Sequence, residues 1–195
     1  MLGVKKPGCG NVIAVPILEE TLQGERIMMK MTELIGHELR WVQLPRAWKS
    51  EYELRTGDII AATLRFRSFI GTSATAASAD GSWTFKGGYY RTKVTVRASG
   101  AETDSAVFKW NTWNTRGTLE LPDGRKYLAN RNFWSGDVEF KTETGDTLIS
   151  YRKIGGRLHK SSEVEIHAPA KEVPEMPWMV LLWWYLTITS SISLN

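Results

Sequence analysis

The stretch Pro177-Trp-Met-Val-Leu-Leu-Trp-Trp-Tyr-Leu-Thr-Ile188, near the C-terminus, decides the fold. No charged residue follows Glu175, and apart from the Tyr185 hydroxyl no polar side chain appears in the stretch before Thr187. A helix without a polar face must be surrounded on all sides, either by protein or by lipid. The sequence therefore predicts a hydrophobic helix over about residues 175–189 that is enclosed by something else.

Prolines and carboxylates mark the start of this helix. Pro174 and Pro177 suit a first helical turn, where a missing N–H costs nothing. Glu172 and Glu175 place negative charge near the positive end of the helix dipole. The strongly apolar part, residues 178–186, is shorter than the roughly 20 residues that a membrane span needs, although the uncharged tail behind it extends the run. A buried core helix is the favoured interpretation, and a membrane anchor is the alternative.

The composition is that of an ordinary globular domain. The chain has 195 residues, of which 42% are hydrophobic and 24% charged, and it carries nine tryptophans. Cys9 is the only cysteine, so neither an internal disulfide nor a cysteine metal cluster can form. The apolar run 12–18 is short and is followed at once by two glutamates, unlike the core of a signal peptide. We therefore expect a cytoplasmic protein, peripheral at a membrane if it meets one.

From residue 38 onward, apolar and polar residues alternate with a period of two, which predicts β-strands. The turn signal Pro122-Asp-Gly124 is the strongest of several that separate them. The expected strands are 38–43, 50–55, 58–67, 72–79, 82–86, 91–98, 103–110, 117–121, 125–130, 137–142, 147–152 and 162–167.

About twelve strands would make a barrel too wide for its own side chains to fill, because barrel diameter grows with strand number. The sequence therefore predicts an all-β fold, a roughly 12-stranded antiparallel closed barrel that encloses the hydrophobic C-terminal helix. The barrel domain would span residues 38–195. Residues 1–37 are expected to form an extension on the outside of this domain. Apolar residues at helical spacing around Met31 and Leu34 allow a short helix there.

This order of about twelve strands and one terminal hydrophobic helix resembles the tubby C-terminal-like superfamily, which includes the phospholipid scramblases and the LURP-one-related proteins. The resemblance covers about residues 38–195. It rests on strand number, on Thr118-Leu-Glu-Leu-Pro-Asp-Gly-Arg-Lys-Tyr127 followed by Asn130-Arg-Asn-Phe-Trp134, and on residues 177–186. The segment 118–134 looks like that of uncharacterised prokaryotic members. The resemblance implies a barrel threaded by the helix.

The chain also departs from these relatives. It has no acidic calcium-binding-like segment before the terminal helix, no cysteine-rich palmitoylation stretch and no tubby C-terminal signature. Scramblase activity and transcriptional roles are therefore not carried over. The tubby domain binds a phosphoinositide through basic side chains on its barrel, so the resemblance favours a lipid ligand without assigning individual residues.

The net charge of +4 is concentrated in one part of the chain. Between residues 59 and 100, six basic side chains face a single acid, Asp80. They are Arg65, Arg67, Lys86, Arg91, Lys93 and Arg97. Alternation points all six outward, and if their strands are neighbours they form one patch for anionic lipid head groups or, less favoured, nucleic acid. An ordinary solvated face is the alternative.

Signals for catalysis are weak. The spacing of His37, His159 and His167 is unlike a metal site, and Glu163 and Glu165 alternate on the predicted wet face. No nucleophile elbow, P-loop or dinucleotide-binding motif is present. We therefore expect no catalytic residue, metal, cofactor or small-molecule substrate, and the oligomeric state stays open.

Tryptophans and asparagines cluster between residues 110 and 134. Aromatic rings beside amides can bind sugars or bases, but we expect the rings to fill the barrel and the amides to support turns. The residues are Trp110, Trp113 and Trp134 with Asn111, Asn114, Asn130 and Asn132. The sequence thus favours a non-enzymatic module that binds anionic phospholipid or another anion. The alternatives are a tail-anchored membrane protein with a cytoplasmic β-domain, and a scramblase-like lipid-handling protein.

Overall fold

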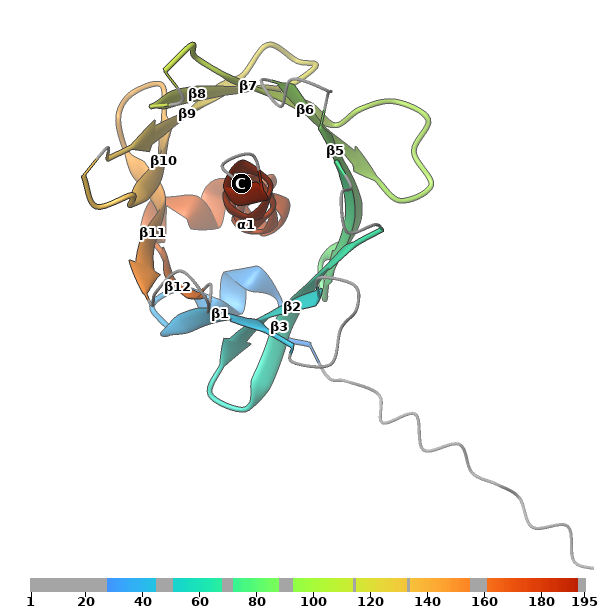
Figure 1. Cartoon of the computed structure of the whole chain (residues 1–195), viewed down its shortest axis with the longest axis vertical. Helices are drawn as coiled ribbons and strands as arrows, with labels where there is room; N and C mark the ends of the chain where they lie inside the picture. Colours follow the sequence, from blue (N-terminus) through green and yellow to red (C-terminus); the bar gives the residue numbers. More distant parts are fainter. Residues whose placement is uncertain are drawn as a thin grey trace, which may run out of the picture.

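A closed antiparallel barrel of twelve strands forms the protein (Figure 1). The computed structural model describes residues 28–44, 51–67, 72–87, 93–113, 115–132, 134–154 and 161–192. The strands are β1 (Leu39–Gln43), β2 (Glu51–Thr56), β3 (Ile59–Phe66), β4 (Ser73–Ser78), β5 (Gly81–Gly87), β6 (Lys93–Ala98), β7 (Ala106–Trp110), β8 (Arg116–Glu120), β9 (Lys126–Arg131), β10 (Val138–Thr142), β11 (Thr147–Ile154) and β12 (Ser161–Ile166).

Each strand pairs with its neighbours in sequence, and β1 pairs with β12 to close the barrel. The predicted fold class is confirmed, and every strand begins and ends within three residues of its expected bounds. The apolar positions of the alternating pattern are buried and the polar positions between them are more exposed. Leu64 and Phe66 of β3 are buried inside, whereas Arg65 between them is exposed.

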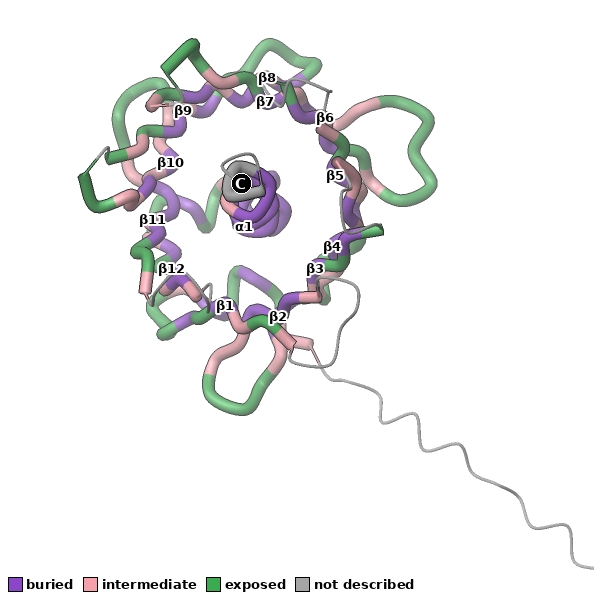
Figure 2. Tube along the Cα trace, viewed as in Figure 1, coloured by how far each residue is buried: buried purple, intermediate pink, exposed green. Residues whose placement is uncertain are grey.

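The C-terminal helix α1 (Met176–Ile192) runs along the barrel axis (Figure 1). Leu181, Leu182 and Trp184 are buried, as an enclosed helix requires, and Figure 2 shows α1 as a buried rod inside the ring. A Leu or Phe side chain contributes about 1.5–3 kcal/mol when it is fully buried, so this helix is a major part of the core. Within the described residues, no helix has the length and apolarity needed to cross a membrane.

Aromatic rings on α1 meet rings on the barrel wall. Trp184 stacks on Trp41 with ring centroids 5.5 Å apart, and Tyr185 stacks on Phe66 at 5.6 Å. Tyr151 of β11 donates its hydroxyl hydrogen bond to helix carbonyls at 3.1–3.3 Å. These contacts fix the rotation of a helix that has no polar face of its own to orient it.

The direction of α1 distinguishes the two ends of the barrel. We call the end where α1 begins the entry end, and the end where α1 finishes the exit end. The 3-10 helix η2 (Ala168–Glu172) leads from β12 to α1 at the entry end. At the exit end, the Tyr185 hydroxyl donates to the carbonyl of Thr72, in the connection between β3 and β4. Because the strands alternate in direction, connections after odd-numbered strands lie at the exit end and those after even-numbered strands at the entry end.

The segment before β1 plugs the entry end. Met31 and Leu34 of η1 (Met31–Leu34) are fully buried in the main core, and the Met31 N–H donates to Asp80 in the β4–β5 turn at 2.9 Å. The expectation that residues 1–37 pack on the outside is wrong for this part, because the barrel needs apolar side chains to close its end. Residues 1–27 lie outside the described residues.

Candidate functional site

The cations predicted to bind anions lie on adjacent strands. Strands β3, β4, β5 and β6 are neighbours in the barrel, and the side chains of Arg65, Arg67, Lys86, Lys93 and Arg97 are all exposed. The sixth residue, Arg91, lies outside the described residues. The structure therefore brings five of the six predicted residues onto one face.

Ion pairs divide this face into two parts. Arg97 lies 2.8 Å from Asp104 in the connection before β7. Arg65 lies 3.5 Å from Glu51, its cross-strand partner on β2. These two arginines are neutralised by neighbouring carboxylates, so they are weak candidates for anion binding.

The remaining cations form what we call the basic cluster: Arg67, Lys86 and Lys93. None of the three has a carboxylate within ion-pair distance in the described part of the chain. All three lie at or near the exit end. Lys93 stands directly opposite another cation, Lys109, whose ammonium is already bound by Glu120 at 2.6 Å. Glu120 therefore offsets the charge of Lys109, while the charge of Lys93 has no acidic partner among the described residues.

Two tryptophans at the same end project into solvent. The side chains of Trp113 and Trp134 are 82% and 92% exposed, so the expectation that they fill the barrel is wrong. Trp110 faces inward from β7 and packs edge-on against Trp183 of α1. The other two lie beyond the strand ends, where alternation no longer directs side chains into the core.

Asparagines shape the two connections that carry these rings. Asn111 accepts hydrogen bonds from the N–H groups of Thr115 and Arg116 at 3.0 and 3.1 Å. Asn132 accepts from the N–H of Trp134 at 2.9 Å and of Ser135 at 3.3 Å. The prediction that the amides support turns is confirmed for Asn111 and Asn132. It is wrong for Asn130, which lies within β9, and Asn114 lies outside the described residues.

A further cation lies on the inner rim at the exit end. Arg131, the last residue of β9, is half-buried, and burial lowers the pKa of its guanidinium. Its N–H donates to the carbonyl of Thr115 at 2.8 Å, which ties the connection holding Trp134 to the one holding Trp113. Arg131 lies outside residues 59–100, where basic residues are in excess, so the charge pattern of the sequence did not single it out.

Charge is distributed unequally between the two ends. This holds for the strand-terminal residues and the described connections from β2 onward. The exit end carries the cations Arg67, Lys93, Arg116 and Arg131 and the acids Glu51 and Asp137. The entry end carries the cations Arg125, Lys126 and Lys171 and the acids Asp58, Asp80, Glu102, Asp104, Glu120, Asp123, Glu143, Asp146, Glu172 and Glu175. The barrel is therefore polar along its axis, with its cationic end where α1 finishes.

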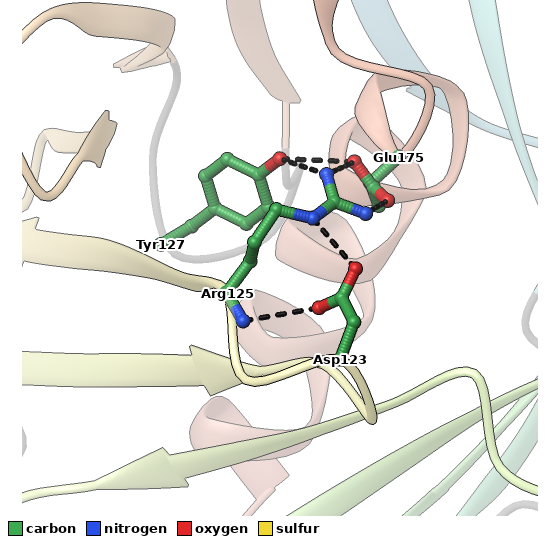
Figure 3. Close-up of polar contacts among 4 residues, drawn as sticks. All are labelled: Asp123, Arg125, Tyr127 and Glu175. Atoms are coloured by element: carbon green, nitrogen blue, oxygen red, sulfur yellow. Dashed lines mark hydrogen bonds and ion pairs between the residues drawn. The ribbon is translucent and has the colours of Figure 1, made fainter.

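At the entry end, four side chains form a connected polar cluster (Figure 3). Arg125 donates to both oxygens of Glu175, at 2.7 and 3.1 Å, and also to Asp123 at 2.7 Å. The Tyr127 hydroxyl donates to Glu175 at 2.9 Å. Burial, helped by this hydrogen bond, raises the pKa of Tyr127 to about 12. We call this group the helix latch, because it fastens the start of α1 to the β8–β9 hairpin.

The helix latch is structural rather than catalytic. Both oxygens of Glu175 already accept hydrogen bonds, and its side chain is nearly buried. A general base needs an oxygen that can reach a substrate proton. The hydrogen bonds of the helix latch therefore serve to fasten the start of α1 in place.

A groove of about 700 Å³ lies on the opposite side of the barrel from β5, along β10, β11 and β12. There, Ser150 Oγ is 2.7 Å from His167 Nε2, and His167 Nδ1 is 3.8 Å from Glu165. The order resembles a nucleophile, base and acid. However, Ser150 lies inside β11, which is paired on both sides, so the nearby N–H groups serve the sheet rather than an oxyanion. The groove is also lined by Glu139 and Glu163, which repel anions.

The histidines do not gather. His37 is exposed, His167 bonds to Ser150, and His159 lies outside the described residues. Among the described residues, no group of three His, Cys, Asp or Glu side chains is placed to hold a metal ion.

Comparisons with protein-family models, curated proteins and solved structures found no match to this chain.

Proposed function

We propose that this protein is a non-enzymatic module that binds anionic phospholipid head groups through the basic cluster Arg67, Lys86 and Lys93. The observation that carries this proposal is that no described carboxylate neutralises the charges of these three side chains. Three cations share one face near one end of the barrel, and no carboxylate of the described residues pairs with them. Solvated surface charges are usually interspersed with opposite charges, as Arg65 and Arg97 are here.

The architecture also supports a lipid ligand. A twelve-stranded barrel threaded by its C-terminal helix is what the resemblance to the tubby C-terminal-like superfamily implies, and a basic barrel face is where the tubby domain holds a phosphoinositide. We propose membership of this superfamily on that basis. A peripheral, cytoplasmic location would follow from the same function.

Neither alternative from the sequence is favoured. A tail anchor would need α1 in contact with lipid, but its Leu181 and Leu182 are buried inside the barrel. A scramblase-like role would need a path for lipid, and the barrel interior is occupied by α1. Nucleic acid would also meet cations, but two exposed rings at one end suit a membrane interface better than a long phosphate backbone.

The test is sedimentation of the protein with vesicles of phosphatidylcholine alone and of phosphatidylcholine mixed with phosphatidylserine. Polybasic attraction is worth about 1 kcal/mol per Lys or Arg, so the triple variant Arg67→Gln/Lys86→Gln/Lys93→Gln should lose about 3 kcal/mol, on the order of 100-fold in partitioning. Binding should also vanish at high salt, since the Debye length falls to about 3 Å at 1 M.

The matched control removes the same net charge from the entry end. The variant Lys30→Gln/Lys126→Gln/Lys171→Gln changes three exposed cations far from the basic cluster and should bind like the unmodified protein. Equal losses in both triple variants would show that only net charge matters. No binding of the unmodified protein to anionic vesicles would end the proposal.

A further inference from the structure

We propose that the barrel docks end-on, with its exit end against an anionic bilayer and with Trp113 and Trp134 inserted into the interfacial layer. This inference rests on the proposed lipid-binding function and adds the contact surface and the orientation of the barrel axis. The basic cluster would supply charge attraction, and the two rings would supply apolar anchoring.

The positions of the rings carry the inference. Among the described residues, the exposed large hydrophobic side chains are Ile59, Trp113 and Trp134. Both tryptophans extend from exit-end connections, and these connections follow β7 and β9, which flank β8. Tryptophan is enriched at membrane–water interfaces because its ring is apolar and its N–H can meet the head groups. Two such rings on adjacent hairpins favour a shared interfacial contact.

Hydrogen bonds order the backbone near both rings before any contact with a membrane is made. Asn111 organises the first connection through two backbone N–H groups, and Asn132 organises the second. The Arg131 N–H bond to the Thr115 carbonyl joins them. A ring whose backbone is already ordered loses less conformational freedom on binding, so preorganisation raises affinity.

The axial charge distribution selects the same orientation. An anionic surface attracts the exit end and repels the acidic entry end, so a barrel approaching a bilayer would turn its axis toward the surface normal. Arg116 and Arg131 flank the connections that carry the tryptophans. Cations and aromatic rings therefore reach the membrane together.

The helix does not need to leave the barrel in this arrangement. Ile188 and Thr189, near the exit end of α1, are still buried. The Tyr185 hydroxyl bonds to the Thr72 carbonyl, which holds this part of the helix against the wall. The membrane contact thus belongs to the hairpin connections and leaves the core intact.

The experiment measures vesicle partitioning and the quenching of tryptophan fluorescence by phosphatidylcholine brominated near the head group, in mixtures with phosphatidylserine. The variant Trp113→Ala/Trp134→Ala should partition at least about tenfold more weakly, since each ring offers roughly 150–250 Å² of surface. It should also lose most of the quenching. The variant Trp113→Phe/Trp134→Phe should keep binding within a few-fold and still lose the quenching. Ile59→Ala, at the entry end, is the control and should behave like the unmodified protein.

The outcomes separate the two proposals. If the unmodified protein binds anionic vesicles and the double alanine variant binds equally well, the end-on contact is wrong while lipid binding stands. If the unmodified protein does not bind such vesicles, both proposals fail. If light scattering shows a dimer that the double alanine variant converts to a monomer, and vesicles are not bound, the rings serve a second copy of the chain and the inference is overturned.

Discussion

Replacing Gly117 with alanine tests how tightly the barrel wall is packed. Gly117 is a buried residue of β8, and a methyl group built there would lie 2.2 Å from Cζ of Phe108. Carbon atoms in contact normally sit about 3.5–4.0 Å apart, so the ring would have to move by more than 1 Å. The ring has little room, because Phe108 packs edge-on against Trp110, with ring centroids 5.0 Å apart, and against Phe140, with ring centroids 6.4 Å apart.

Overpacking of this kind costs about 1–3 kcal/mol, and the alanine recovers only about 0.5–1 kcal/mol of the cost of glycine in a strand. We therefore expect Gly117→Ala to lower the free energy of unfolding by about 1–2 kcal/mol, measured by urea titration with circular dichroism. The neighbouring, partly exposed change Thr118→Ala is the control and should shift it by less than about 0.5 kcal/mol.

A second variant makes the reasoning specific. Phe108→Leu removes the part of the ring that the new methyl group meets, so the double variant Gly117→Ala/Phe108→Leu should be more stable than the sum of the single effects predicts. We expect a favourable coupling of about 1 kcal/mol or more, which is typical of residues in contact. A Gly117→Ala protein as stable as the unmodified one, or strictly additive effects, would refute the packing of Phe108 over Gly117.

Three further predictions concern the helix and its latch. Leu182→Asp should unfold the protein under ordinary conditions, since it buries an unpaired charge; a folded variant by circular dichroism would show that α1 is not enclosed. Glu175→Ala should cost about 1–3 kcal/mol in urea unfolding, because it leaves the buried Tyr127 hydroxyl without its acceptor; a variant as stable as the unmodified protein would contradict the helix latch. For Tyr127, the folded pKa of about 12 lies above the unfolded value of 10, so the stability it contributes is full below pH 10 and is lost as the pH rises toward 12. Tyr127→Phe should therefore make the unfolding free energy less sensitive to pH between 10 and 12, and an unchanged slope would count against this assignment.

Local patterns were sufficient to predict the fold. The period of two located every strand, and the helix without a polar face required an enclosure that a wide barrel supplies. The bounds of α1 differ slightly from the expected 175–189, because Thr187 and Thr189 satisfy their hydroxyls on helix carbonyls and allow the helix to continue.

The binding face was only partly predictable. Alternation placed the cations outside, but their neutralisation depends on which residues face each other across strands. Arg65 meets Glu51 through the β2–β3 register, which includes an irregularity next to Leu54. Arg97 meets Asp104 across a connection. Both acids lie outside residues 59–100, the segment with the excess of basic residues, and sequence periodicity alone does not give the register.

The exposed tryptophans had a signal that the strand pattern concealed. Trp113 and Trp134 each follow a turn-forming asparagine by two residues, and such positions lie past the end of a strand. The axial charge distribution was also present in the sequence, because most acids of the connections follow even-numbered strands, which all end at the same end of a closed antiparallel barrel. The period-two pattern describes the wall of a barrel and carries no information about its rims.

The enclosed helix has a consequence for how the chain is made. Strand β1 can close the barrel only against β12, and the pair Arg40 and Glu163 lies 123 residues apart in the sequence. The last element, α1, must then be inside before or as the ring closes, since it fills the space that the wall surrounds. A ribosome adds only about 5–20 residues per second, so the first strands wait many seconds with their apolar faces and edges uncovered. Such non-local topologies fold slowly, and we expect the nascent chain to depend on chaperones until synthesis has passed α1.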